Sequence, residues 1–282
     1  MGKMKKWFVA AMAVCLSAMM LAGCGGSPEA STAPTGSPEQ TQSADASLTT
    51  IKDKGELIIG LDDSFPPMGF RDDAGELTGF DVEMVKEVCK RLGVTAKLQP
   101  IDWNAKEMEL NSKTVDVLWN GYTITDERKE KVLFSDPYMK NTQVVVVLKD
   151  SSIQKLDDLK GKKVAVQDGS SAQEALQSNE AIYSEIKQID FKENVTAFLD
   201  VDNKQVDALA IDEVVANYYL AKKPDTYRIL DETLAPEEYG VGFRKEDVAL
   251  RDEVQKIMDE MVADGTAKSL SEKWFGKDVT LK

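Results

Sequence analysis

Residues 115–138 read VDVLWNGYTITDERKEKVLFSDPY. The apolar run at 115–119 predicts a buried β-strand, and the polar residues that follow it directly, from Asn120 to Arg128, predict a loop and a helix start. In a sheet covered by helices, ligands bind just beyond the carboxyl ends of the strands. This stretch is therefore the first place to look for a binding site.

Further apolar runs alternate with helical patterns along the chain. Expected strands lie at 57–61, 96–98, 142–148, 163–167, 208–211 and 239–243. Helical spacing appears at 80–92, 172–176 and 250–261. Alternating strands and helices predict an α/β fold with sheets covered on both faces.

Four motifs and the ending of the chain carry a resemblance to a known family. They are DDSFPP at 62–67, GFDVE at 79–83, GYTITDER at 121–128, FSDPY at 134–138 and KWFG at 273–276. In this order they resemble the polar-amino-acid group of bacterial extracellular solute-binding proteins, family 3, which feed ABC importers. The resemblance covers nearly all of the chain beyond residue 61.

The resemblance implies a two-lobed periplasmic-binding-protein fold of the type II-like kind. Lobe 1 would comprise residues 48–143 and 244–282, and lobe 2 residues 149–238. Residues 144–148 and 239–243 would be the two hinge strands. The lobes would close on one solute and present it to a membrane permease, and the protein would be a monomer.

The resemblance also implies a clamp for an L-α-amino acid. A guanidinium can bind a planar carboxylate with two hydrogen bonds, and Arg128 occupies that family position. Asp212, after the apolar run at 208–211, would receive the α-ammonium group. Thr123 would bind the carboxylate, and Ser170 and Ser171 lie where a strand gives way to a helix, whose N-terminal N–H groups favour anions.

The remaining candidates would surround the ligand's side chain. Phe65 and Trp103 match two aromatic walls, and Asp62 and Asn120 would lie at the side-chain end or rim. Gly121 and Gln167 are the other two ligand-binding candidates. Asp62 favours a basic or amide-bearing side chain but also occurs in relatives with neutral ligands. Which amino acid binds therefore stays open.

Each candidate also has a simpler interpretation. Arg128, within Asp-Glu-Arg-Lys-Glu, could be a solvated charge, and Trp103 could be an ordinary core residue. Asp212, Ser170 and Ser171 could be helix N-caps. Cys89, on the apolar face of its helix, is expected to be buried packing rather than a reactive thiol.

The N-terminus has the pattern of an exported lipoprotein. Three lysines and an apolar stretch at 7–21 precede Leu-Ala-Gly-Cys at 21–24. The stretch is too short for a transmembrane helix, which needs roughly 20 residues, and fits a signal peptide. Residues 1–23 would be removed and Cys24 lipidated. Residues 25–47, rich in Ser, Thr, Pro and Gly, would form a disordered tether at the cell membrane.

Composition excludes several function classes. The formal net charge is −14, which disfavours nucleic acid as a partner. The chain has no histidine, which excludes Ser-His-Asp catalysis and His-ligated zinc. We predict a binding protein that needs no metal or cofactor, with an L-amino acid, a permease and indirectly its ATPase as partners.

Two rival functions stay open at this point. Some proteins of this fold are lyases that resemble cyclohexadienyl dehydratase, for which Asp62 or Asp212 could act as a base. Others are receptor modules that sense a ligand rather than deliver it. The predicted lipid anchor and amino-acid clamp favour transport.

Overall fold

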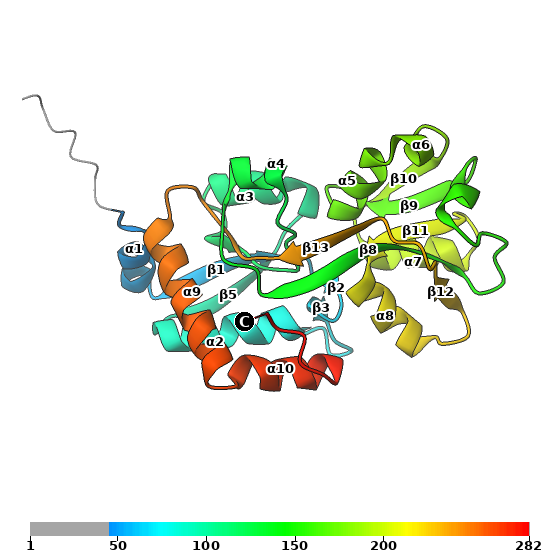
Figure 1. Cartoon of the computed structure of the whole chain (residues 1–282). Coiled ribbons are helices and arrows are strands. Elements are labelled where there is room, and N and C mark those ends of the chain that lie inside the picture. The colour runs from blue at the N-terminus through cyan, green and yellow to red at the C-terminus, as the bar shows by residue number, and fades with distance from the viewer. Residues whose placement is uncertain (1–44, 282) are drawn as a thin grey trace, which may run out of the picture. The chain divides into compact units, whose positions relative to one another are not determined.

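A computed structural model of the chain describes residues 45–281, which form one compact unit. The expected signal peptide, Cys24 and nearly all of the expected tether lie outside the described residues. Helices and strands alternate along the described part, as the sequence predicts (Figure 1). Within it, no helix combines the length and the apolar character needed to cross a membrane.

The first sheet has five strands in the order β5-β1-β6-β14-β7. Their bounds are β1 Glu56–Leu61, β5 Thr95–Pro100, β6 Val117–Leu118, β7 Leu133–Phe134 and β14 Gly242–Phe243. Strands β5, β1 and β6 are parallel, whereas β14 is antiparallel to both β6 and β7. The helices of this part are α1 Ser47–Lys54, α2 Phe80–Leu92, α3 Lys106–Asn111, α4 Asp126–Lys131, α9 Val248–Ala263 and α10 Thr266–Phe275.

The second sheet follows the order β10-β9-β11-β8-β12, and β13 also pairs with β8. Its strands are β8 Met139–Leu148, β9 Lys163–Gln167, β10 Lys187–Phe191, β11 Ala208–Asp212, β12 Tyr227–Ile229 and β13 Ala235–Tyr239. The helices between them are α5 Ser171–Ser178, α6 Glu180–Tyr183, α7 Asn194–Asp202 and α8 Glu213–Lys222. Strands β10, β9 and β11 are parallel, so their carboxyl ends lie at one edge.

Short elements complete the fold. Strands β2 Ser64–Phe65, β3 Gly69–Arg71 and β4 Leu77–Thr78 form a small antiparallel sheet directly after β1. Two 3₁₀ turns, η1 Trp103–Ala105 and η2 Leu156–Leu159, follow β5 and β8. The small sheet and η1 bring aromatic side chains to the edge where the parallel strands of the first sheet end.

Helix α2 illustrates how the sequence produces these elements. Its buried residues recur at helical spacing and pack against the first sheet, and Gly93 ends the helix in the left-handed conformation. Cys89 is buried on this face, as predicted, and its burial raises the pKa of the thiol to about 12. The thiol is therefore uncharged at neutral pH and serves packing.

Strands β8 and β13 belong to the second sheet, run side by side and reach from it toward the first sheet (Figure 1). They pair from Gln143 opposite Ala235 to Met139 opposite Tyr239. The expected single strand at 239–243 is wrong, because Gly240 and Val241 break it into β13 and β14 as the chain passes to the first sheet. The two hinges at 144–148 and 239–243 and the boundaries of the two lobes stay predictions.

Candidate functional site

All eleven predicted binding residues are buried and line one pocket. They follow the carboxyl ends of β1, β6, β9 and β11 or lie on the short elements beside them. The residues are Asp62, Phe65, Trp103, Asn120, Gly121, Thr123, Arg128, Gln167, Ser170, Ser171 and Asp212. The structure thus gathers the whole predicted set, and contact of these residues with a ligand stays a prediction.

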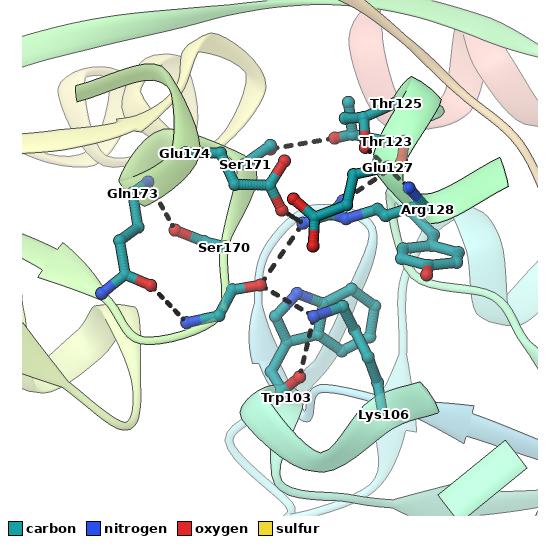
Figure 2. Close-up of polar contacts among 12 residues, drawn as sticks. Trp103, Lys106, Thr123, Thr125, Glu127, Arg128, Ser170, Ser171, Gln173 and Glu174 are labelled. Atoms are coloured by element: carbon teal, nitrogen blue, oxygen red, sulfur yellow. Dashed lines mark hydrogen bonds and ion pairs between the residues drawn. The ribbon is translucent and has the colours of Figure 1, made fainter. Parts of the chain in front are cut away.

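Arg128 supplies the positive charge of the pocket (Figure 2). It lies in the first turn of α4, which Thr125 caps by accepting a hydrogen bond from the Arg128 backbone N–H. The guanidinium donates from Nη1 to the Thr123 carbonyl (3.1 Å) and from Nη2 to the Gly169 carbonyl (3.3 Å) and Glu174 Oε1 (2.8 Å). Its buried Nε has no partner among the described residues. Arg128 is therefore no solvated charge, and one donor of its fork is uncommitted.

Asp212 supplies the acidic group from the second sheet. Its Oδ1 accepts hydrogen bonds from Asn141 Nδ2 (2.8 Å), Gln143 Nε2 (2.8 Å) and the Tyr239 hydroxyl (2.5 Å). Although Asp212 precedes α8, its side chain makes no capping hydrogen bond. Burial, reinforced by the negative charge of nearby Glu237, raises the pKa of Asp212 well above its usual range. A cation beside this carboxyl would therefore be strongly favoured.

The two serines behave differently. Ser170 is the N-cap of α5 and accepts a hydrogen bond from the Gln173 N–H (3.2 Å), so the capping interpretation holds for it. The Ser171 hydroxyl lies 2.9 Å from the Thr123 hydroxyl, across the pocket (Figure 2). This hydrogen bond joins the two sides of the pocket.

The other end of the pocket is amphipathic. The aromatic rings of Phe65 and Trp103 lie near the buried Asp62 carboxylate, which accepts from Gln167 Nε2 (2.6 Å) and from both the N–H and hydroxyl of Ser64. Burial outweighs these donors and raises the pKa of Asp62. Asn120 also lines this pocket, and its buried Oδ1 lacks a partner among the described residues.

Gly121 shapes the pocket with its backbone. Its φ is 55°, and an added Cβ would lie 2.8 Å from a ring carbon of Phe65. Its N–H donates to Asp81 Oδ2 (2.7 Å), an oxygen that also accepts from the Tyr138 hydroxyl. Only glycine tolerates both this conformation and this close approach.

Residues 57–277 match the bacterial extracellular solute-binding proteins, family 3. The chain belongs to this family. The L-cystine-binding protein TcyJ of Escherichia coli is 38% identical over 238 residues, which cover 83% of this chain and 87% of that protein. The arginine-binding extracellular protein ArtP of Bacillus subtilis is 32% identical over 274 residues, covering 96% and 98%.

Solved structures of family members agree with the fold. A substrate-binding protein of an ABC uptake transporter from Streptococcus pneumoniae, with bound histidine, superposes with a TM-score of 0.81 at 38% identity and covers 85% of this chain and all of its own. The arginine-binding protein of T. maritima gives 0.72 at 38% identity, covering 80% and 99%. The predicted family, two-lobed α/β fold and binding rather than enzymatic function are confirmed, and the lyase alternative is set aside.

The sequence did not reveal a second layer of polar residues around the family's pocket. Lys106 is buried and donates to the carbonyl oxygens of Gly169 (2.8 Å) and Trp103 (3.2 Å). Burial and the neighbouring Arg128 charge lower its pKa to about 8. The one sequence signal for the burial of Lys106 is its position one helical turn from Trp103 and from Leu110, which are both buried. The Asp212 partners Asn141, Gln143 and Tyr239 had none, because distant strands bring them together.

The described residues contain no group of three carboxylate or cysteine side chains placed to hold a metal ion.

Proposed function

We propose that this chain is the extracytoplasmic substrate-binding lipoprotein of an ABC importer and captures a polar L-amino acid. The observation that carries the proposal is the charge pair of the pocket. The buried guanidinium of Arg128 comes from α4, on the side of the first sheet, and the buried carboxyl of Asp212 from β11 of the second sheet. An α-amino acid carries the complementary carboxylate and ammonium on one carbon.

The clamp assigns a role to each end of the ligand. Arg128 and Thr123 would hold the α-carboxylate, and Ser171 would add a hydroxyl beside the N-terminus of α5. Asp212 would hold the α-ammonium. Phe65 and Trp103 would enclose the side chain, and Asp62 favours one that ends in a basic or amide group. The cystine, arginine and histidine named for the relatives support a polar ligand.

Binding would require the two sheets to separate and close again. In the structure, Thr123 contacts Ser171 and Asp62 contacts Gln167, so the pocket walls touch. A ligand that bridges Arg128 and Asp212 would favour the closed arrangement over an open one, as ligand-driven closure requires. The paired strands β8 and β13 and the segment at 240–241 would carry the hinge.

Delivery of the amino acid to a permease would also involve the N-terminal part of the chain. Lipidation of Cys24 would tether the protein to the cell membrane, where a permease would recognise the closed, monomeric form and an ATPase would drive import. The signal pattern at residues 1–24 supports this part of the proposal. The membership of the chain in the solute-binding protein family supports the importer role.

A thermal-shift screen tests the ligand class. Residues 45–282 would be heated with each L-amino acid, with L-cystine and with D-enantiomers. A ligand at a thousand times its dissociation constant adds about 4 kcal/mol of stability, which raises the Tm by several degrees. We expect a stereoselective rise for one or a few polar L-amino acids. Absence of any response would refute the amino-acid assignment.

A further inference from the structure

A second carboxyl group lies beside Asp212. Glu237 of β13 faces Asn141 of β8 in the strand register, and Gln143 of β8 faces Asp212 of β11. Because side chains alternate along a strand, Asn141, Gln143, Glu237 and Asp212 share one face of these neighbouring strands. The cluster thus lies where the chain crosses between the two sheets.

The two carboxyl groups share the same donors. Asn141 Nδ2 lies 2.8 Å from Asp212 Oδ1 and 2.6 Å from Glu237 Oε1. Gln143 Nε2 lies 2.8 Å from each of these oxygens. The side-chain amides of Asn141 and Gln143 therefore hold the two carboxyl groups close together, although two negative charges so close would repel each other.

The surrounding charges do not neutralise the pair. No lysine or arginine forms an ion pair with Asp212 or Glu237 in the part of the chain that the structure describes. Arg128, across the pocket, is paired with Glu174 of α5. Tyr239 donates its hydroxyl to Asp212, and a groove on the other side of Glu237 is lined by Lys129 of α4, Lys140 of β8 and Glu238 of β13. Lys129 is paired with Asp126.

We infer that Glu237 is a positioning residue for the amine end of the site, acting with Asp212 as a carboxyl pair that holds one proton until a ligand's ammonium group displaces it. The inference rests on the proposed function. Asp212 is buried and Glu237 is half-buried, and two carboxyls held by the same donors take up a proton as a pair with its own apparent pKa values. An ammonium group at Asp212 supplies the missing positive charge, and the proton leaves to solvent.

This arrangement links binding to pH. The raised pKa of Asp212 is caused first by burial and then by the charge of Glu237. The ligand-free protein therefore holds more protons than the complex below that pKa, so acid weakens binding. A glutamine at 237 cannot ionise, so the part of the pKa rise that the Glu237 charge causes would be lost while the part caused by burial remains, and less of a proton would be released.

Isothermal titration calorimetry measures this proton release. Residues 45–282, which form one compact unit, would be titrated with L-arginine, L-histidine or L-cystine, whichever binds most tightly, in buffers of different ionisation enthalpy between pH 5 and 8. We expect the wild type to release up to one proton per ligand and Glu237→Gln to release measurably less at the same pH. The affinity of Glu237→Gln should also vary less with pH.

Glu238→Gln is the matched control, since Glu238 is the next residue on β13 and points to the opposite face. It makes the same charge change and should keep the wild-type proton release. Because every protein receives the same ligand, protonation of the ligand itself cancels. Equal release by the wild type and Glu237→Gln would overturn the inference, as would no release by the wild type. Failure of all three ligands and of the thermal-shift screen would instead refute the proposed function.

Discussion

At the scale of single residues, Arg128 is the sharpest test of the amino-acid clamp. We expect Arg128→Ala to weaken ligand binding by at least about 3 kcal/mol, because a buried carboxylate would lose its charged partner. Calorimetry on the ligand identified by the thermal screen measures the loss. Lys129→Ala is the control, since Lys129 is the next residue of α4, is exposed and pairs only with Asp126 among the described contacts. A loss below tenfold, about 1.4 kcal/mol, would contradict the role of Arg128.

Gly169 allows the closed arrangement to be tested without touching a charge. Its φ is 71°, and a Cβ there would lie 2.8 Å from the Asn104 Cα of η1, beside the first sheet. We expect Gly169→Ala to hold the walls apart and weaken ligand affinity at least about tenfold. Gly161 has a φ of 76° and nothing within 4 Å of an added Cβ. Gly161→Ala should thus lose a similar stability, about 1 to 2 kcal/mol, and bind normally. Equal affinities of the two variants would show that Gly169 does not limit closure.

At the scale of elements, Asp81 joins the first turn of α2 to two other segments. Its carboxylate accepts from the Gly121 N–H in the pocket loop and from the hydroxyl of Tyr138, just before β8. Burial raises the pKa of Asp81 to about 7, against 3.8 for an ordinary Asp. The folded protein therefore binds more protons than the unfolded chain between these values, so this group's contribution to stability falls as the pH rises from about 4 to 7.

Removing the charge of Asp81 should flatten that dependence. We expect Asp81→Asn to lose less Tm than the wild type between pH 5 and 8, with an upper limit of about 3 kcal/mol for the effect on unfolding across this range. Differential scanning calorimetry at several pH values measures it. Asp264→Asn is the control, because hydrogen bonds from Thr266 and Arg91 lower the pKa of Asp264 to about 2, outside this window. An unchanged slope in Asp81→Asn would contradict the assignment.

Elements with a strong local pattern were predictable from sequence, whereas contacts between distant elements were not. Strand β9 and helix α2 have the bounds expected for them, and β11 is one residue longer than expected, because apolar spacing and flanking glycines or polar residues define these elements locally. The break at Gly240 and Val241 depends on how β14 pairs with β6 and β7, which no local pattern encodes. The pocket residues came from family motifs, but Glu237 meets Asp212 only through strand pairing.

At the scale of the whole molecule, side chains from both sides of the pocket hold its walls together. Lys106 and Arg128, from the first sheet's side, both donate to the Gly169 carbonyl, and Arg128 also pairs with Glu174 (Figure 2). Lys192 lies 3.4 Å from Asp102 across the same gap. If the protein opens and closes as proposed, these contacts add to the stability of the closed form. A protein that closes part of the time without ligand binds more tightly, since apparent affinity scales with the competent fraction.

Lys106→Met should therefore reduce the closed fraction of the ligand-free protein. We expect a larger radius of gyration by small-angle X-ray scattering and an affinity about tenfold weaker, because a hydrogen bond from a charged group is worth about 1.5 to 3 kcal/mol. Lys131→Met, which removes an exposed lysine paired within α4, should change neither quantity. Unchanged scattering and affinity in Lys106→Met would mean that the ligand alone holds the closed form together.

Glu174→Gln separates two roles of the ion pair between Glu174 and Arg128. Weaker ligand binding by this variant would mean that Glu174 helps to close the pocket walls. Tighter binding would mean that Glu174 competes with the ligand's carboxylate for Arg128.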